Sequence, residues 1–519
     1  MPSTALPLLL LRRRQPVVWA VALLLSCCLG GRLSADEGAK PTAPAGAANR
    51  DPFRAENLTI PAGNHQLAGT LYLPQCGPPA PAVVFVHGAG PAVRGDGYHE
   101  LARHFARKGV AALIYDKRGC GASTGDWTRA GMYDLAEDAL ACVQLLRGRP
   151  EINPAQVGLW GLSQGASIIP IAASRSSDVA FVIAVGGCLD FEGQMRYFRA
   201  NLFRRFGHPP AVLDIANKAF LFQFDLSNRI RSGSLPAPAA LRDANRFEID
   251  LDQAAVWRQV RQPVLAIYGE RDQQVPVAAN SAALAAAVEQ SGNRDFTLII
   301  YPGASHAVGK TRTGELGEEW TGYVPEYLQD MTDWVREKAS GVKRPEGWSQ
   351  RGRVPESNQP FTAEQYDRLR WYGNAPVQAS QFVVFAVVFL VGAVAATVGL
   401  VRGRQGDRGP TAPRRRKWLT PVATAVSVLN LALLTGLVAL VLGLANQWEP
   451  SYPGVLNWLP VAGSLSACLA LMLLAFLFVG RRASADSRRK RIGWILFATC
   501  ALAFVPFLHY WNLLGLTWH

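Results

Sequence analysis

The chain has 519 residues, enough for two or three domains, and 49% of them are hydrophobic, so we expect membrane segments. Its formal net charge of +14 by itself resembles that of a nucleic-acid-binding protein. However, residues 36–380 contain 36 Lys and Arg against 36 Asp and Glu, so the excess charge lies beside apolar segments and reflects membrane topology. This distribution argues against a nucleic-acid partner.

Residues 1–35 have the composition of a secretory signal peptide. The basic Arg12-Arg13-Arg14 precedes an apolar run, Pro16 to Leu29, that is short for a bilayer span of about 20 residues. Leu33-Ser34-Ala35 offers small residues for cleavage. Two alternatives remain open, a lipid attached to Cys27 within a lipobox-like segment and an uncleaved anchor.

Residues 36–53, rich in Ala, Pro and Gly, are predicted to be a linker. From residue 54 to 340, buried strands alternate with amphipathic helices, which predicts an α/β domain with a mostly parallel sheet covered by helices. The expected strands are 58–60, 66–73, 82–86, 110–115, 157–160, 181–185, 264–268 and 296–301, and the expected helices are 98–108, 132–146, 166–174, 278–290 and 323–338.

Residues 190–252 interrupt this alternation and are predicted to form a helical cap insertion. Its aromatic and basic residues are typical of a solvated amphipathic helix. A lid over an active site is the alternative, because an insertion at this point would overhang the carboxyl ends of the strands.

One pentapeptide, Gly161-Leu162-Ser163-Gln164-Gly165, lies between a predicted strand and a predicted helix. This is the strand–turn–helix context of a nucleophile elbow, in which a strained turn exposes the serine hydroxyl. Gly161 and Gly165 allow the strand and the helix to approach closely. The Gln164 N–H and the helix N-terminus would point toward an oxyanion.

Together with four further segments, this motif resembles the α/β-hydrolase family over residues 54–339, in particular its esterase, acyl-thioesterase and prolyl-oligopeptidase-like branches. The further segments are His87-Gly88-Ala89-Gly90, Asp116-Lys117-Arg118-Gly119-Cys120-Gly121-Ala122-Ser123, Gly269-Glu270-Arg271-Asp272 and Gly303-Ala304-Ser305-His306.

The resemblance implies a Ser–His–Asp triad in the chain order of that fold. Serine is a weak nucleophile, so Ser163 needs a base, and His306 follows the last predicted strand at the same sheet edge. Asp272 is expected to orient His306, with Glu270 as the competing carboxylate. No cofactor or metal is expected.

The second oxyanion donor is expected from Ala89, beside Gly88, with Gln164 as the first. His87 is expected to be a structural hydrogen-bonding residue. Asp116 and Arg118 are expected to form a fixed ion pair that braces the active-site loops. A disulfide among Cys76, Cys120, Cys142 and Cys188 is allowed but not assigned.

Residues 341–380 are predicted to be a linker, and residues 381–519 a membrane domain with four transmembrane helices, 382–401, 418–445, 456–480 and 492–516. These four segments contain no Asp, Glu, Lys or Arg, so an anchor or partner-binding role is favoured over a channel. The arginine-rich segments 402–417 and 481–491 predict a cytoplasmic location for these loops, which places the α/β domain on the periplasmic side of a bacterial inner membrane.

The sequence therefore predicts a membrane-tethered serine hydrolase that cleaves carboxyl esters, thioesters or small peptides. A small-molecule acyl compound is the expected substrate, and a CoA thioester is disfavoured outside the cytosol. The alternatives are a non-catalytic ligand-sensing ectodomain coupled to a membrane domain, and a transporter with an accessory domain. The absence of charged residues in the four apolar segments disfavours the transporter.

Overall fold

The structure is a computed structural model that describes residues 51–75, 77–244, 251–340, 349–355, 371–406, 416–445, 450–479 and 488–518. The predicted signal peptide, Cys27, Cys76 and much of both arginine-rich loops lie outside the described residues. The described chain forms two compact units. We call them the sheet unit (residues 51–205 and 228–355) and the helical unit (residues 206–227 and 371–518).

The sheet unit is built on a sheet of nine strands within the described residues, in the order β1-β2-β4-β3-β5-β6-β7-β8-β9. Strands β1 and β2 pair antiparallel, as do β2 and β4, and all other neighbours are parallel. The strands are β1 (Phe53–Ala62), β2 (His65–Pro74), β3 (Ala80–Val86), β4 (Ala111–Tyr115), β5 (Ile152–Leu162), β6 (Val182–Val185), β7 (Val264–Gly269), β8 (Phe296–Tyr301) and β9 (Ser349–Arg351).

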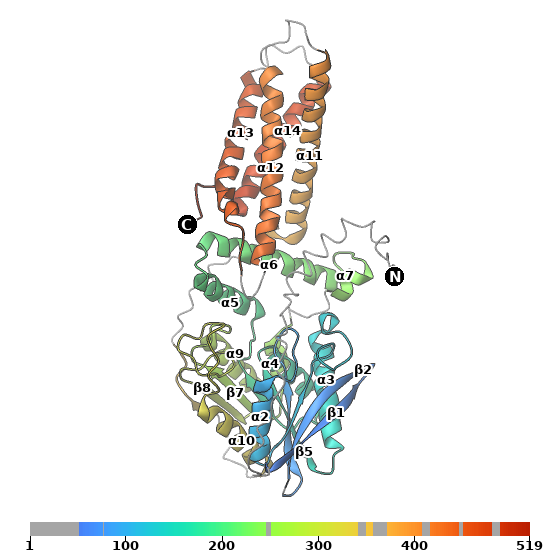
Figure 1. The fold of residues 1–519 in the computed structure, drawn as a ribbon, viewed down its shortest axis with the longest axis vertical. Coiled ribbons are helices and arrows are strands. Elements are labelled where there is room, and N and C mark those ends of the chain that lie inside the picture. Colours follow the sequence, from blue (N-terminus) through green and yellow to red (C-terminus); the bar gives the residue numbers. More distant parts are fainter. Residues whose placement is uncertain are drawn as a thin grey trace, which may run out of the picture. The chain divides into compact units, whose positions relative to one another are not determined.

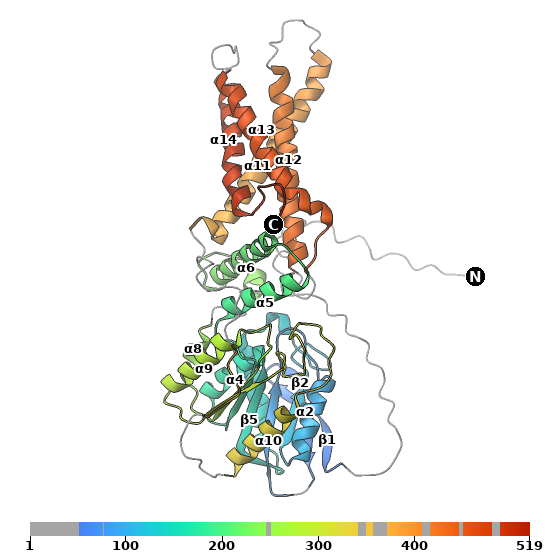
Figure 2. The same cartoon turned by 90° about the vertical axis from the view of Figure 1, so that its left-hand side faces the viewer.

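Helices cover both faces of this sheet (Figures 1 and 2). Buried side chains of α2 and α10 join one apolar cluster, and those of α3, α4, α8 and α9 join the cluster on the other face. The helices of the unit are α2 (Asp96–Arg107), α3 (Met132–Arg147), α4 (Gln164–Arg175), α5 (Phe191–Arg205), α7 (Ala239–Ala244), α8 (Gln253–Trp257), α9 (Val277–Gln290) and α10 (Pro325–Ala339). This architecture confirms the predicted fold class.

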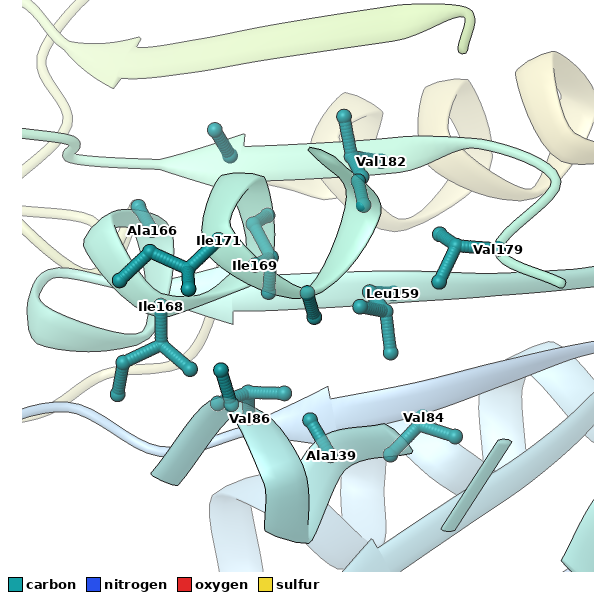
Figure 3. Packing of buried hydrophobic residues seen from close by; sticks show 14 of the residues in the cluster. Val84, Val86, Ala139, Leu159, Ala166, Ile168, Ile169, Ile171, Val179 and Val182 are labelled. Carbon is teal, nitrogen blue, oxygen red and sulfur yellow. The ribbon is translucent and has the colours of Figure 1, made fainter. Parts of the chain in front are cut away.

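The central strands are buried on both faces, which explains their continuous apolar sequences. All five residues of β4 are buried, as are all four of β6. Around α4, Ile168 and Ile169 lie among Val84, Leu159 and Ala139 from neighbouring elements (Figure 3). This packing fixes the N-terminus of α4, where the elbow lies, against the carboxyl end of β5.

Four helices of the helical unit are long and apolar enough to cross a membrane, counted over the described part of the chain. They are α11 (Ala375–Gly406), α12 (Arg416–Leu444), α13 (Leu459–Val479) and α14 (Arg488–Tyr510). The predicted number of apolar helices is confirmed. However, α14 ends at Tyr510 and not at residue 516, because Asn512 and Gly515 have positive φ angles. Likewise, α11 begins at Ala375, inside the predicted linker.

The predicted linker 341–380 also contains β9, which pairs with β8. Its sequence, Ser-Gln-Arg, is exposed and has no apolar alternation, so periodicity alone does not reveal it. The cap insertion is helical, as predicted. It differs from the prediction in its division, because residues 206–227, most of α6 (Pro210–Arg231), belong to the helical unit.

Within the helical unit, α6 and the turn just before it are bonded to three other segments. Asp214 Oδ2 accepts hydrogen bonds from Asn512 Nδ2 at 2.7 Å, and Asp225 Oδ2 accepts one from the Ala375 N–H at 2.8 Å. His208 Nε2 lies 2.7 Å from the Pro450 carbonyl. The insertion is therefore hydrogen bonded to residues at the ends of the apolar helices and in the segment that joins α12 to α13.

Candidate active site

Ser163 has the strained backbone of an elbow residue. Its φ of 54° and ψ of −112° lie outside the regions that non-glycine residues normally adopt. A Cβ added at Gly161 would collide with the Gly165 backbone, and one added at Gly165 would collide with the Val86 carbonyl. The two glycines are thus required by the close approach of β5, α4 and β3.

The carboxyl end of β6 lies between Ser163 and His306. The Ser163 N–H donates to the Val185 carbonyl at 2.8 Å. At the next residue, Gly186, an added Cβ would lie 2.8 Å from His306 Cε1, so the imidazole rests directly on this backbone. One short strand end therefore brings Ser163 and His306 to the same edge of the sheet.

A carboxylate is bonded to the inner nitrogen of His306. Asp272 Oδ2 lies 2.7 Å from His306 Nδ1, and both side chains are buried. Asp272 Oδ1 accepts from the N–H groups of Gln274 and Val275 at 2.7 and 2.8 Å, which fixes the carboxylate. The competitor Glu270 instead accepts from the Gly303 N–H at 2.9 Å.

The outer nitrogen of His306, Nε2, is buried and has no hydrogen-bond partner in the part of the chain that the structure describes. No hydrogen bond therefore joins it to Ser163 here. Catalytic hydrogen bonds are often long in a free enzyme and shorten when a substrate binds. Bonded to a carboxylate through Nδ1, the ring can accept a proton at Nε2.

The loop after β3 passes beside the elbow. A Cβ added at Gly88 would lie 3.7 Å from Ser163 Cβ. Ala89 follows and is exposed. On the other side, Gln164 is the first residue of α4, so its N–H has no acceptor within the helix. The predicted oxyanion donors thus flank Ser163 from two elements.

His87 is buried, and its Nε2 is hydrogen bonded to the Tyr115 carbonyl. Its ring packs edge-on against Tyr98, with the ring centroids 4.5 Å apart. Burial lowers the pKa of His87 to about 4, so the imidazole is neutral near pH 7. These contacts join the end of β3 to the end of β4, as expected for a structural residue.

The expected ion pair between Asp116 and Arg118 is wrong. Asp116 instead pairs with Arg94, whose Nε lies 3.0 Å from Oδ1, and Arg118 pairs with buried Asp138, 2.7 Å from each carboxylate oxygen. Adjacent residues beyond a strand end point in different directions, so each finds a partner elsewhere. Both pairs brace loops, but they brace different ones.

Sequence reasoning missed the roles of three charged residues: Arg94 and Asp138, which pair with Asp116 and Arg118, and Lys117. Each acts across a large separation along the chain, so no local spacing reveals it. Lys117 is the nearest to the oxyanion loop, because its Nζ lies 2.6 Å from the Gly88 carbonyl. Cys120, Cys142 and Cys188, three of the candidates for a disulfide, are free thiols.

Comparison with known proteins gives a consistent picture. The alpha/beta hydrolase family matches residues 83–315. Esterase EstD of Thermotoga maritima is 25% identical over 267 residues, which cover 49% of this chain and 60% of EstD. Thiohydrolase apmlB of Arthrinium phaeospermum is 34% identical over 89 residues, 17% of this chain and 29% of that protein. The chain thus spans less than two thirds of either relative.

Among solved structures, the complex of DcsB with its substrate analogue has a TM-score of 0.39 and 19% identity, over 56% of this chain and 100% of that one. Est1E from Butyrivibrio proteoclasticus, solved with bound ferulic acid, has a TM-score of 0.35 and 17% identity, over 55% of this chain and 98% of that one.

Proposed function

We propose that the chain, whose residues 83–315 match the alpha/beta hydrolase family, is a membrane-tethered serine hydrolase that works through an acyl-enzyme. The observation that carries this proposal is the 2.7 Å bond between His306 Nδ1 and Asp272 Oδ2, next to a serine with φ of 54°. A strained serine costs stability, and such strain is usually kept where it serves a function.

In this proposal Ser163 Oγ attacks the substrate carbonyl carbon while His306 Nε2 takes the hydroxyl proton. Asp272 stabilises the resulting imidazolium. The carbonyl oxygen becomes an oxyanion, which the N–H groups of Ala89 and Gln164 stabilise. His306 then gives its proton to the leaving group as the bond to the acyl carbon breaks.

Water completes the cycle by the same chemistry. His306 removes a proton from the water, the hydroxyl attacks the acyl carbon, and the ester bond to Ser163 breaks as Ser163 regains a proton. The substrate is a carboxyl ester, a thioester or a small amide. The names of the two relatives, an esterase and a thiohydrolase, favour the first two of these classes.

The four apolar helices support a membrane tether, and the arginine-rich loops beside them support an orientation. Short basic loops remain in the cytoplasm, so the first apolar helix would enter from outside. We infer that the sheet unit faces the periplasm of a bacterium, from the inner membrane. The proposed signal peptide predicts the same orientation independently.

A fluorophosphonate probe tests the proposed chemistry, because it reacts covalently with an activated serine. Labelling of the purified full chain should be lost in Ser163→Ala and kept in Ser174→Ala, a control on the same helix whose hydroxyl bonds to the Ile171 carbonyl. Hydrolysis of p-nitrophenyl acyl esters should follow the labelling. Equal labelling of both variants would contradict the assignment of the nucleophile.

The alternative of a non-catalytic, ligand-sensing ectodomain makes the opposite prediction. Such a protein would bind acyl compounds without turnover and would not react with the probe. The bonded Asp272–His306 pair argues against it, because a binding protein has no need of an oriented base beside a strained serine.

A further inference from the structure

Lys117 is a buried cation behind the oxyanion loop. It follows β4 and is 4% exposed. Its Nζ lies 2.6 Å from the Gly88 carbonyl, 2.9 Å from the Gly90 carbonyl and 3.1 Å from Gln164 Oε1. An ammonium group has three N–H donors and no acceptor, so these three oxygens satisfy it completely.

None of these three acceptors is a carboxylate. The nearest acidic neighbour along the chain, Asp116, is bonded to Arg94 and to the Ala122 N–H. Within the described part of the chain, the hydrogen-bond acceptors of the Lys117 ammonium are therefore neutral oxygens. Burying a cation in this way is costly, and the cost is offset only where the charge serves a purpose.

The two carbonyls belong to the loop that holds Ala89. The Gly88 carbonyl and the Ala89 N–H are parts of one peptide group, and in a trans peptide they point in opposite directions. When Lys117 binds the carbonyl, it turns the N–H away from itself. A charged donor on the carbonyl also polarises the peptide and makes its N–H a stronger donor.

Gly88 has a second contact that holds its backbone in place. The hydroxyl of the partly buried Tyr98 is hydrogen bonded to the backbone of Gly88. The third contact of Lys117, with the Gln164 side chain, reaches the residue that supplies the other proposed oxyanion donor. One ammonium group thus touches both segments that flank Ser163.

We propose that Lys117 is a positioning residue of the oxyanion site, holding the Ala89 and Gln164 segments together and adding positive potential where the oxyanion forms. This inference rests on the proposed function, since an oxyanion forms only if Ser163 attacks a carbonyl. In this proposal Lys117 acts through the oxyanion donors and contacts neither the substrate nor the triad.

Lys117 also makes the site sensitive to alkaline pH. Burial lowers the pKa of Lys117 to about 8, and the Cys120 thiol partly opposes this shift. The His87 imidazole also faces the same region, and it is neutral there. As pH rises through about 8, the ammonium loses a proton, so one of the three oxygens loses its donor and the positive potential disappears.

The test compares Lys117→Met with Lys108→Met in the full chain. Lys108 caps the end of α2 at the amino end of β4, away from the carboxyl ends where the site lies. With a p-nitrophenyl ester, Lys117→Met should lower kcat about 100-fold, as loss of one oxyanion donor does, with little change in KM. Lys108→Met should match the wild type.

A second measurement separates positioning from mere structural support. A trifluoromethyl ketone forms an anionic tetrahedral adduct with the serine, so its inhibition constant should rise by the same factor as kcat falls. Fluorophosphonate labelling at Ser163 should persist, more slowly. If Lys117→Met is labelled and keeps wild-type kcat and ketone affinity, the inference is wrong. Loss of kcat without loss of ketone affinity would overturn it as well.

If Lys117→Met does not fold, Gln164→Glu decides the question. The new carboxylate would lie beside the ammonium and raise the pKa of Lys117, so the alkaline limb of the kcat profile should move to higher pH. An unmoved limb would refute the inference. Retention of activity by Ser163→Ala would instead refute the proposed function, so the two failures are distinguishable.

Discussion

At the scale of single residues, the two carboxylates after β7 have different partners. Asp272 is bonded to His306, and Glu270 to the Gly303 N–H. We expect Asp272→Asn to lower kcat by about 10³-fold or more, because the amide cannot stabilise the imidazolium. Glu270→Gln keeps an acceptor for Gly303 and should change kcat little. Steady-state kinetics on a p-nitrophenyl ester would show a misassigned acid if Glu270→Gln were the damaging change.

His87 makes the stability of the sheet unit depend on pH. Its folded pKa is about 4 because of burial, whereas an unfolded histidine has a pKa of about 6.5. The unfolded state therefore binds the proton more tightly, and stability falls as pH drops from about 6.5 to about 4. The full loss is on the order of 3 kcal/mol.

The check on this prediction is His87→Gln, which keeps a donor for the Tyr115 carbonyl but cannot gain a proton. Between pH 7 and pH 4.5, the thermal midpoint of the detergent-purified variant should fall less than that of the wild type. Parallel curves for the two proteins would mean that other groups dominate acid destabilisation.

The contact between Asp272 and His306 was predictable, because both residues follow neighbouring parallel strands whose carboxyl ends meet at one edge. The environment of Lys117 was not. Its three acceptors come from two other segments, and nothing in Asp-Lys-Arg-Gly tells which side chain turns inward. The predicted ion pair between Asp116 and Arg118 was wrong for the same reason, because their actual partners, Arg94 and Asp138, lie far away along the chain.

At the scale of elements, α5 supports the acid-bearing loop. The Tyr197 hydroxyl donates to the Asp272 carbonyl at 2.9 Å, and Asn201 Nδ2 donates to the Gln273 carbonyl at 3.0 Å. Tyr197→Phe removes one of these bonds and should lower kcat severalfold through less precise placement of Asp272. Asn201→Asp should have a comparable effect, because it replaces a donor by a charge. Wild-type kcat in both would assign α5 to packing alone.

The basic end of α5 allows a test of whether the insertion influences substrate choice. Arg204 and Arg205 are exposed, and Arg205 lies 3.8 Å from Glu315. If the insertion admits amphiphilic substrates with anionic head groups, replacing Arg199, Arg204 and Arg205 with Gln should lower kcat/KM for anionic esters more than for neutral ones. Equal effects on both classes would leave α5 a solvated amphipathic helix.

The apolar helices show which features of a helix can be predicted from hydropathy and which cannot. Their number followed from hydropathy and length, since runs of this size without charge have few other uses. Their ends did not, because capping and packing decide where a helix stops. The assignment of most of α6 to the helical unit could not be predicted either, since the sequence of an amphipathic helix does not show which unit packs against its apolar side.

At the scale of the whole molecule, the orientation can be tested by cysteine accessibility. The chain's eight native cysteines are first replaced, and single cysteines are then placed at Gly406, the last residue of α11, and at Gly454, between α12 and α13. In spheroplasts, a membrane-impermeant maleimide should label residue 454 and not residue 406. The reverse pattern would place the sheet unit in the cytosol and make CoA thioesters the leading substrates.

The division of the insertion between the two units has a consequence for biosynthesis. Residues 206–227 leave the ribosome long before α11, yet their bonding partners include Ala375 and Asn512, near the end of the chain. These two hydrogen bonds of α6 can therefore form only after α11 has begun and α14 has been made. A chain cut short before α14 would lack Asn512, so Asp214 of α6 would lose this hydrogen-bond donor.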